Sequence, residues 1–586
     1  MLRRRLLAGP LLLLGLAACA PDASSTVSTT PVTEVTTAGP TLPVEETTTT
    51  TTSPPVASST TLLDTPATTV PIVPEDRWVE IVDGAFVDTR TGEPFVPLGV
   101  NLLLKRGGGG ADRMFSSYDE GWVDAQLDEI AALGFSTVRF FLDMCMRCTA
   151  TSDGIREDYL DALADLLTRL EAHGLVALPT SNDVPDPGFS DRLPCCEPFG
   201  GYRNSLYLSE EGHEISVAYW TALIDGIRAR GTPTHHVLGW QLANEQFILR
   251  DVAPVSLTEG FVTTADGITY DLANDAEVEA MFVSNLREYI TTVGDAIREL
   301  DPGALVTMGF FSAADPEAGR IGLDQRWVVP AQIVADSTLD FVDLHAYPGF
   351  GGTWDAIGTA FGLTGEEPTF PVLLGEFGAF EDAYQSSDNG AAAMARWQAG
   401  SCDFGFDGWL LWFWGAEADD EVIPVNLDDA AIARALTTTV RPDPCDVGPY
   451  ASANFALERP VTASAEENAE YSAVRVVDGS ASTWWSAADG PPQWVEIDLE
   501  GDRSVSRVEI LIGHVSPPGL QTHRVRLRSA GDPAPGFVAG EVTADVPQGT
   551  VLTVEFDTVP DVRFVRVETL AADGWVILHE IEVFAG

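Results

Sequence analysis

Two glutamates stand at the ends of apolar, strand-like runs that lie far apart in the chain. Glu245 closes the run VLGWQLANE directly after Asn244, and Glu376 lies in PVLLGEFG, 131 positions further on (376 − 245). A carboxylate at the end of a buried strand is unfavourable unless it is paired or used in chemistry. Taken alone, Glu245 would be an ordinary surface or capping residue. The recurrence of the pattern, each time before a loop and a helix-like stretch, predicts a site with two carboxylates.

Two carboxylates that flank a glycosidic bond can hydrolyse it. One protonates the leaving oxygen and the other attacks the oxocarbenium-like carbon, and a separation of roughly 5–5.5 Å gives retention of configuration. We expect Glu376 to be the nucleophile and Glu245 the acid/base. With Glu376 charged nearby, Glu245 should hold its proton more tightly, and this bias should disappear once Glu376 is esterified.

Other polar residues follow the ends of the same strand-like runs. Arg139 would keep Glu376 ionised by its charge, although it could simply satisfy a buried carboxylate, and Tyr347 could hydrogen-bond to Glu376. Asn244 is placed to bind the sugar 2-hydroxyl. His345 is either a substrate-binding residue or a hydrogen-bonded core histidine.

Two tryptophans in the last apolar run, Trp412 and Trp414, are expected to point the same way from a strand. We predict that one of them, with Trp412 favoured, offers its flat face to a sugar ring and that the other packs in the core.

The middle of the chain alternates between strand-like and helix-like patterns. Between the strand-like runs lie amphipathic stretches such as DAQLDEIAALG, with apolar spacing of three and four and glycine after the last turn. Eight such units predict a (β/α)₈ barrel, with functional residues at the carboxyl ends of the strands. A doubly wound open sheet is the alternative, but no glycine-rich phosphate loop follows the first strand. The eight runs are PFVPLGVN, FSTVRFF, LVALPTSN, VLGWQLANE, ALVTMGFF, LDFVDLHAYP, PVLLGEFG and FDGWLLWFWG.

The motifs WQLANE, LHAYP and GEFG resemble those of glycoside hydrolase family 5 and its wider barrel clan. The resemblance covers about residues 80–440, and it implies acid/base and nucleophile glutamates on the fourth and seventh strands. The matching positions are Arg139, Asn244, Glu245, His345, Tyr347 and Glu376. The chain departs from the family near the end of the third strand, where PTSND, with Asn182 and Asp183, replaces the usual histidine.

After Pro444 the pattern changes to short alternating strands without amphipathic helices, which predicts a β-sandwich. NFALERPVTAS, VVDGSASTWWSA and LHEIEVF resemble the discoidin, or coagulation factor type C, domain, a jelly-roll sandwich close to carbohydrate-binding module family 32. The resemblance implies a structural calcium ion held by Asp478, Thr483 and Glu580. The alternative is that these three residues only cap loops.

The first residues, MLRRRLLAGPLLLLGLAACA, combine a basic start, a short apolar run and small residues, as in a secretory signal. Leu16-Ala17-Ala18-Cys19 resembles the bacterial lipobox, which implies cleavage before Cys19 and lipid on its sulfur, unless this cysteine stands near an ordinary cleavage site by chance. Residues 20–75 are rich in Thr, Ser and Pro and are expected to form a disordered stalk or spacer. We therefore expect four parts: a signal (1–19), this linker (20–75), the barrel (76–445) and the sandwich (450–586).

Charge limits the choice of partners. The chain carries 88 Asp and Glu against 33 Lys and Arg, a formal net charge of −55, and Lys105 is its only lysine. A field of that sign repels phosphate backbones, which argues against nucleic acid, whereas a neutral polysaccharide is unaffected. We expect an extracellular monomer, held at the cell surface by lipid only, that acts on a polysaccharide without a catalytic cofactor.

Six cysteines follow Cys19. In an exported chain an even number favours disulfides, and we expect Cys402 to pair with Cys445. Zinc bound by four thiolates is the alternative for the remaining four, because Cys145 and Cys148 have ligand spacing. The adjacent Cys195 and Cys196 fit that geometry poorly.

The function favoured by these patterns is a retaining β-glycosidase that acts on β-1,4-glucan or β-mannan. Two alternatives are a barrel that binds carbohydrate without turnover and an adhesion protein whose last domain carries the function.

Overall fold

The structure is a computed structural model of the whole chain. It describes residues 76–585, except for 105–113, 144–147, 183, 186–187, 194–197, 313–318, 323, 349–352, 365–367, 381–386, 416–430, 453, 458, 470, 480–482, 513–517 and 548–549. The predicted signal, Cys19 and the linker lie outside the described residues.

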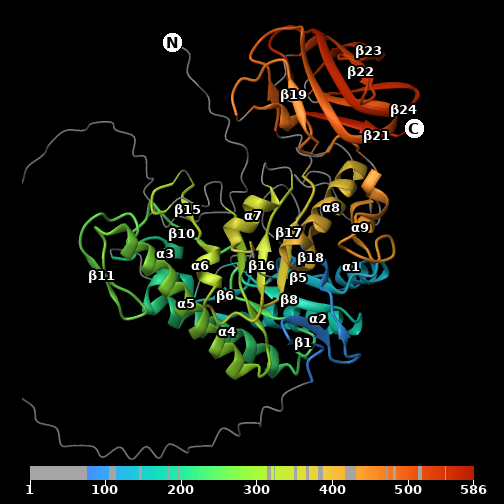
Figure 1. The fold of residues 1–586 in the computed structure, drawn as a ribbon. Coiled ribbons are helices and arrows are strands. Elements are labelled where there is room, and N and C mark those ends of the chain that lie inside the picture. Colours follow the sequence, from blue (N-terminus) through green and yellow to red (C-terminus); the bar gives the residue numbers. More distant parts are fainter. Residues whose placement is uncertain are drawn as a thin grey trace, which may run out of the picture. The chain divides into compact units, whose positions relative to one another are not determined.

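Eight parallel strands close into a barrel, as predicted, and each of the eight strand-like runs contains one of them. β13 pairs with β9 and β14 pairs with β16, and only Met308 separates β13 from β14, so these two segments together act as the fifth strand and close the ring. In Figure 1 helices surround the central strands. The strands are β4 (Leu98–Leu102), β5 (Thr137–Phe141), β8 (Val176–Thr180), β9 (Trp240–Gln241), β13 (Val306–Thr307), β14 (Gly309–Phe311), β16 (Val342–His345), β17 (Val372–Phe377) and β18 (Phe406–Trp414).

Helices alternate with these strands, and short polar side chains fix where several of them begin. Asp119 accepts hydrogen bonds from the backbone N–H groups of Gly121 and Trp122, and Ser209 and Asn274 cap later helices in the same way. The helices are α1 (Glu120–Ala132), α2 (Glu157–Ala172), α3 (Tyr202–Leu208), α4 (Glu210–Ala229), α5 (Asp275–Leu300), α6 (Pro330–Val334), α7 (Trp354–Phe361), α8 (Ser387–Ser401) and α9 (Ala431–Leu436).

An antiparallel hairpin closes the amino-terminal end of the barrel. Its strands are β1 (Val79–Val82) and β2 (Ala85–Asp88), and β3 (Glu93–Pro94) pairs with β2. Val79 and Phe86 pack in one cluster with Leu178, Leu238 and Phe341 from the barrel segments. This end is therefore apolar, and polar side chains are left to the opposite end, where active sites of such barrels lie.

The loops of the barrel also form three short antiparallel strand pairs. These are β6 (Ala150–Thr151) with β7 (Gly154–Ile155), β10 (Ile248–Leu249) with β15 (Arg326–Trp327), and β11 (Phe261–Thr263) with β12 (Thr269–Asp271).

The last domain is an antiparallel β structure with its own core. Two long strands, β21 (Gln493–Ile512) and β24 (Thr550–Ala571), pair along their length, with register shifts between Asp498 and Arg507. β22 pairs with one end of β24, and β26 pairs with the other end of β21. Residues of both halves, such as Ile497 and Ile510, meet in one buried cluster. The remaining strands are β19 (Val461–Ala463), β20 (Trp485–Ser486), β22 (Gly519–Arg528), β23 (Phe537–Val546), β25 (Ile577–Leu578) and β26 (Glu580–Phe584).

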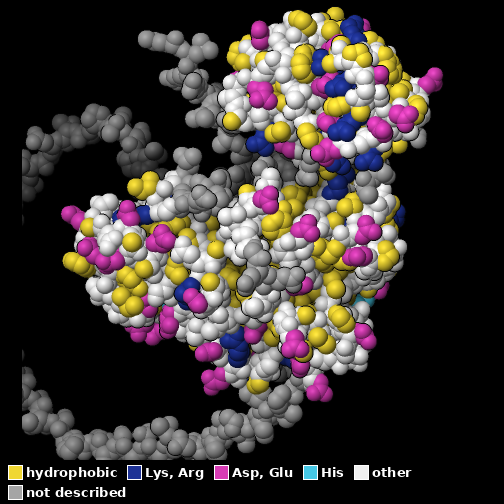
Figure 2. Space-filling view, viewed as in Figure 1, with side chains coloured by type: hydrophobic (Ala, Val, Ile, Leu, Met, Phe, Trp, Pro, Cys, Tyr) yellow, Lys and Arg dark blue, Asp and Glu magenta, His cyan; other side chains and the backbone are white. Residues whose placement is uncertain are grey.

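Acidic side chains are spread over the face of the molecule in Figure 2, as the net charge requires. Among the helices of the described residues, none combines the length and the apolar character needed to cross a bilayer.

One predicted cross-link is present. Cys402 and Cys445 form a disulfide that closes a loop with a sequence separation of 43 residues. Cys148 is also disulfide-bonded, so it cannot be a zinc thiolate. The four-thiolate alternative is therefore wrong for this residue.

Replacing both Cys402 and Cys445 by serine should lower the free energy of unfolding of the barrel by about 2–4 kcal/mol, because the open loop gains conformational freedom in the unfolded chain. Urea unfolding of the wild type and the double variant, followed by tryptophan fluorescence, measures this difference. Equal midpoints under non-reducing conditions would contradict the expectation.

Candidate active site

The carboxyl ends of four barrel strands bring together the residues singled out by the sequence. Arg139 lies in β5, Glu245 follows β9, His345 ends β16 and Glu376 lies in β17. Arg139 donates from Nη1 to Glu376 Oε1 at 2.7 Å, and His345 Nδ1 lies 3.2 Å from Glu245 Oε1 and 3.5 Å from Glu376 Oε2. All four side chains therefore lie together at the carboxyl ends of the barrel strands.

The two glutamates lie close enough to act on one bond. One oxygen of Glu245, one oxygen of Glu376 and one ring nitrogen of His345 all lie within 4.8 Å of one another. An oxygen–oxygen distance below this limit is compatible with the roughly 5–5.5 Å between carboxyl groups that act by retention, and it is shorter than the roughly 6.5–9.5 Å that inversion needs for an intervening water. The Glu376 side chain is 5 % exposed and that of Glu245 is 27 % exposed, so Glu245 is the more accessible of the pair.

The guanidinium of Arg139 is buried and fully engaged. Besides Glu376, it donates to Gln241 Oε1 at 2.8 Å, to Asn101 Oδ1 at 2.6 Å and to Asn244 Oδ1 at 2.5 Å. Asn101 lies in β4, whereas Gln241 and Asn244 lie in β9 and just beyond its carboxyl end, so one cation fixes three side chains relative to Glu376. A buried guanidinium is tolerated because its N–H groups are satisfied in this way.

Tyr347 makes the contact with the nucleophile that was expected, and the contact of Asn244 with a sugar hydroxyl stays a prediction. The Tyr347 hydroxyl donates to Glu376 Oε2 at 2.6 Å, and burial together with the charge of Glu376 raises the pKa of Tyr347 well above its ordinary value, so it remains a donor. Because Asn244 uses its oxygen on Arg139, its amide N–H groups remain to donate to a sugar hydroxyl.

His345 is buried among charges. Burial opposes its protonation, but the negative charges of Glu376 and Asp343 and its contacts with Asp343 and Glu245 outweigh this and raise the pKa of His345 to about 9. The imidazole is therefore a cation near neutral pH, in contact with both glutamates.

This cation overturns one expectation about Glu245. Burial would raise the pKa of Glu245, but the hydrogen bond and charge of His345, with smaller effects of Arg326 and Arg139, hold it below its ordinary value. The sequence argument considered only the charge of Glu376 and therefore predicted the opposite direction. In the free protein the proton resides on His345, one hydrogen bond away from Glu245.

The two tryptophans differ in their surroundings. Trp414 is fully buried and donates from Nε1 to Gln126 Oε1 of α1 at 2.9 Å, which places it in the core. Trp412 is 4 % exposed and meets the ring of Phe141 edge to face at 6.1 Å. The use of Trp412 as a sugar platform stays a prediction.

Four polar residues of the barrel interior were not singled out by the sequence: Asn101, Thr180, Gln241 and Asp343. Gln241 links Arg139 to Asp343 and accepts from Thr180 Oγ1 at 2.5 Å. Each lies within one of the mainly apolar strand-like runs. A polar side chain inside such a run was the signal that could have identified them.

At the departure from the family pattern, the backbone N–H of Asn182 donates to Asp143 Oδ1 at 2.7 Å, and Asp183 lies outside the described residues.

The glutamates and His345 could also be considered as metal ligands. A protonated imidazole has no lone pair to offer, and Arg139 already supplies a cation at 2.7 Å from Glu376. The charge balance favours an acid–base site.

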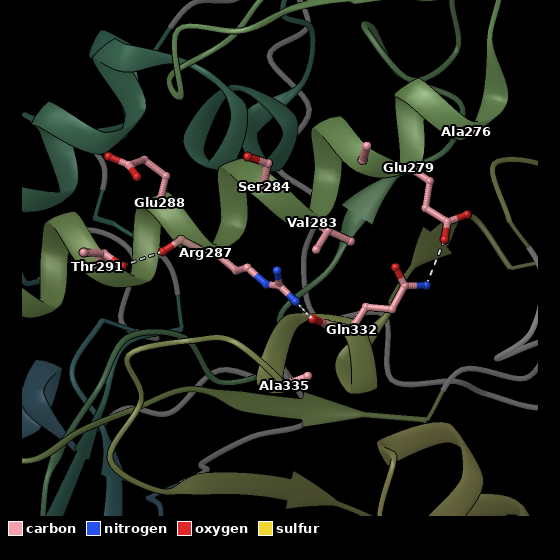
Figure 3. A pocket seen from close by; sticks show the side chains of 10 residues that line it. Ala276, Glu279, Val283, Ser284, Arg287, Glu288, Thr291, Gln332 and Ala335 are labelled. Atoms are coloured by element: carbon pink, nitrogen blue, oxygen red, sulfur yellow. Dashed lines mark hydrogen bonds between the residues drawn. The ribbon is translucent and has the colours of Figure 1, made fainter.

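A groove of about 720 Å³ lies elsewhere, along α5 and α6 on the outside of the barrel (Figure 3). Its polar groups bond to one another: Gln332 Nε2 donates to Glu279 Oε1 at 2.8 Å, and Arg287 donates to the Gln332 carbonyl. The groove contains no pair of groups arranged for acid–base or nucleophilic chemistry.

In the last domain the three residues proposed for calcium do come together. Thr483 Oγ1 donates to the Asp478 carboxylate at 2.8 Å, and the Gly479 N–H donates to Glu580 Oε1 at 3.2 Å. Glu580 Oε2 is buried and has no hydrogen-bond partner among the residues that the structure describes. Burial, and then the charges of Asp478 and Glu582, raise the pKa of Glu580 well above its ordinary value.

A comparison with protein families finds a match in the last domain. Residues 475–567 match the family model described as a NedA-like, galactose-binding domain of the F5/F8 type C group. No curated protein matches the chain.

Among solved structures, an endo-1,4-β-mannanase from Rhizomucor miehei is similar at 18 % identity over 62 % of this chain and 98 % of its own, with a TM-score of 0.44. An exo-β-1,4-mannosidase from an Opitutaceae bacterium is 20 % identical over 57 % of this chain and 54 % of its own, with a TM-score of 0.38. A chitosan-binding module of a Paenibacillus sp. chitosanase/glucanase is 30 % identical over 22 % of this chain and 98 % of its own, with a TM-score of 0.20.

Arg139→Met should destabilise the barrel by about 3–5 kcal/mol, because it leaves Glu376 and Asp343 buried without their cation. Protonation removes the charge of an unpaired buried carboxylate and with it most of the desolvation cost. The loss of unfolding free energy relative to wild type should therefore be smaller at pH 5 than at pH 8. Urea unfolding at the two pH values measures it.

Arg77→Met is the matched control. Arg77 is equally buried and pairs with Asp301, but Asp301 keeps hydrogen bonds from Thr234 and Trp240. Arg77→Met should therefore lose less unfolding free energy than Arg139→Met. A loss of stability in Arg139→Met that is the same at both pH values would contradict the role given to Arg139.

Proposed function

We propose that the protein is a retaining β-glycosidase that hydrolyses a polysaccharide. The observation that carries this proposal is the pair of carboxylates at opposing strand ends, with oxygens within 4.8 Å of each other and of His345. A pair with this spacing suits double displacement, in which one carboxylate attacks and the other handles the proton.

The two glutamates differ in ways that assign their roles. Glu376 is held by Arg139 and Tyr347 at 2.7 and 2.6 Å, which fixes its orientation for attack on the anomeric carbon. Glu245 is more exposed and contacts His345, which can supply a proton to it. In the first step Glu376 forms an ester with the sugar as Glu245 protonates the leaving oxygen. In the second, Glu245 takes a proton from water as water displaces Glu376.

The substrate class follows from charge and domain content. We expect β-1,4-glucan or β-mannan, neutral polymers that the acidic surface does not repel. A domain that matches a galactose-binding model fits a role in holding the protein on a glycan, which raises the effective concentration of substrate at the barrel. The alternatives, binding without turnover and adhesion through the last domain, are outcomes of the tests below.

The location at the cell surface through lipid on Cys19, the monomeric state and the absence of a nucleic-acid partner are part of the same proposal. They rest on the amino-terminal sequence and on the charge.

The wild type should release reducing sugar from at least one member of a panel of β-1,4-glucans and β-mannans. Glu376→Ala should abolish this release, and Glu245→Gln should lower kcat/KM by about 10²–10⁴-fold on substrates with poor leaving groups. Proton NMR of the first product should show the β-anomer, as retention requires. Glu171→Gln on α2, which contacts His235 outside the site, is the control and should keep full activity.

Activity that survives in Glu376→Ala, or an α-anomer as the first product, would refute double displacement with Glu376 as the nucleophile. Glycan binding by the wild type without release of sugar from any substrate would favour the non-catalytic alternative.

We also propose a structural calcium ion in the last domain. Asp478, Thr483 and Glu580 offer oxygen ligands, which this cation prefers, and the unpartnered Oε2 of Glu580 fits a ligand atom. Two neighbouring carboxylates in a buried site repel each other unless a cation lies between them. The ion would hold the loop around Asp478 to β26.

Calcium should raise the melting temperature of the last domain in the wild-type protein, and a chelator should lower it, because the ion binds only the folded state. Asp478→Asn should remove this calcium dependence, whereas Glu555→Gln, at an exposed position of β24, should retain it. Differential scanning calorimetry with and without chelator measures the effect. A wild-type melting temperature that is insensitive to calcium would refute the site.

A further inference from the structure

Asp343 is a fully buried carboxylate that the proposed reaction does not use. Its Oδ2 lies 3.5 Å from Arg139 Nε and 3.5 Å from His345 Nε2, and it accepts a hydrogen bond from Gln241 Nε2. The interior of such barrels is dominated by branched apolar side chains. A third carboxylate inside this one, beside two reacting glutamates, requires an explanation, because desolvation opposes it by several kcal/mol.

The backbone makes room for this carboxylate. Gly375 directly precedes Glu376, and a Cβ at position 375 would lie only 1.8 Å from Asp343 Oδ1. No other residue at position 375 could coexist with Asp343 in this place. The nucleophile strand is therefore shaped around Asp343.

Three carboxylates face the imidazole of His345. Glu245 and Glu376 approach Nδ1 at 3.2 and 3.5 Å, and Asp343 approaches Nε2 from the other side. The facing cation is Arg139, and the remaining titratable neighbour, Tyr347, donates to Glu376.

These three carboxylates behave differently during turnover. Glu376 loses its charge when it becomes an ester, and Glu245 loses its charge when it takes a proton. Asp343 has no access to substrate or water, since it is 0 % exposed, and it stays beside Arg139. Of the three carboxylates, Asp343 is therefore the one whose negative charge acts on His345 in every step of the reaction.

We propose that Asp343 is a positioning residue that keeps the proton shared by His345 and Glu245 on the histidine between steps, and so sets when Glu245 is an acid and when it is a base. This proposal rests on the proposed function. Glu245 passes its proton to the leaving oxygen as the glycosidic C–O bond breaks and the bond from Glu376 to the anomeric carbon forms. That proton came to Glu245 from His345 Nδ1.

The second half of the reaction returns the proton. Water attacks the anomeric carbon, the bond to Glu376 breaks, and the water proton moves to Glu245 and then to His345. One water is consumed, and the pair ends with the protonation it had at the start.

The test is Asp343→Asn, which keeps the shape and removes the charge. The ring signals of His345, assigned by their loss in His345→Gln, are followed by NMR as a function of pH in the resting full-length protein. We expect the wild-type imidazole to stay protonated beyond pH 8, and its titration to move down by about 1–3 pH units in Asp343→Asn. The alkaline limb of kcat/KM should move in the same direction.

Asp301→Asn is the matched control. Asp301 is also a buried carboxylate paired with an arginine, Arg77, and it accepts from Trp240 Nε1 at 2.9 Å. This variant should lose stability without any change in the His345 titration or in the pH profile. A purely structural role of Asp343 would give the same pattern in Asp343→Asn.

An unchanged His345 titration in Asp343→Asn would therefore overturn the proposal. If Asp343→Asn does not fold, the His345 titration of the wild type is the test. A His345 ring that is neutral at pH 8 in the wild type would also overturn the proposal. A wild type that hydrolyses none of the glycans but shows the expected shift in His345 would refute the proposed function and leave the effect of Asp343 on His345 intact.

Discussion

The mouth of the barrel depends on one buried guanidinium. Arg139 donates to Glu376, Asn101, Gln241 and Asn244 at 2.5–2.8 Å, and without it an acceptor oxygen of each of these side chains would lose its hydrogen bond from the guanidinium in a desolvated site. The orientation of the nucleophile, the direction of the Asn244 amide and the position of Gln241 beside Asp343 all follow from it. Because the cation is fixed from several sides, the carboxylates around it need no solvent to remain charged.

Opposite charges at the site largely compensate one another. Arg139 and His345 supply two positive charges, against Glu245, Glu376 and Asp343. In the proposed reaction Glu376 loses and regains its charge, and His345 gives up and regains a proton, while Arg139 stays charged throughout. Such an arrangement stabilises charge changes by fixed groups rather than by reorganised water. The apolar hairpin at the far end of the barrel makes this possible, since it excludes water from the opposite side.

Much of this arrangement could be predicted from the sequence. The alternation of strand-like and helix-like runs gave all eight barrel strands, and the rule that active sites lie at carboxyl ends of strands located Arg139, Glu245, His345 and Glu376. The network inside the barrel could not be predicted, because Gln241 and Asp343 look like isolated polar residues until the strands are closed around them. The pKa of Glu245 was predicted in the wrong direction because only the charge of Glu376 was considered, whereas the closed barrel brings His345 within 3.2 Å of Glu245. Periodicity gives positions along a strand but not the distances between strands.

The sequence separations of the Arg139 hydrogen bonds have a consequence for folding. Its partners lie 38, 102, 105 and 237 residues away along the chain. Contacts of such range form late, after the loops between them have closed. A folding intermediate that lacks β17 would contain Arg139 without Glu376, so burying that region early would be unfavourable. Ring closure and assembly of the charged mouth are thus expected to be a single cooperative event, and a chain truncated before β17 should leave this region open to proteases.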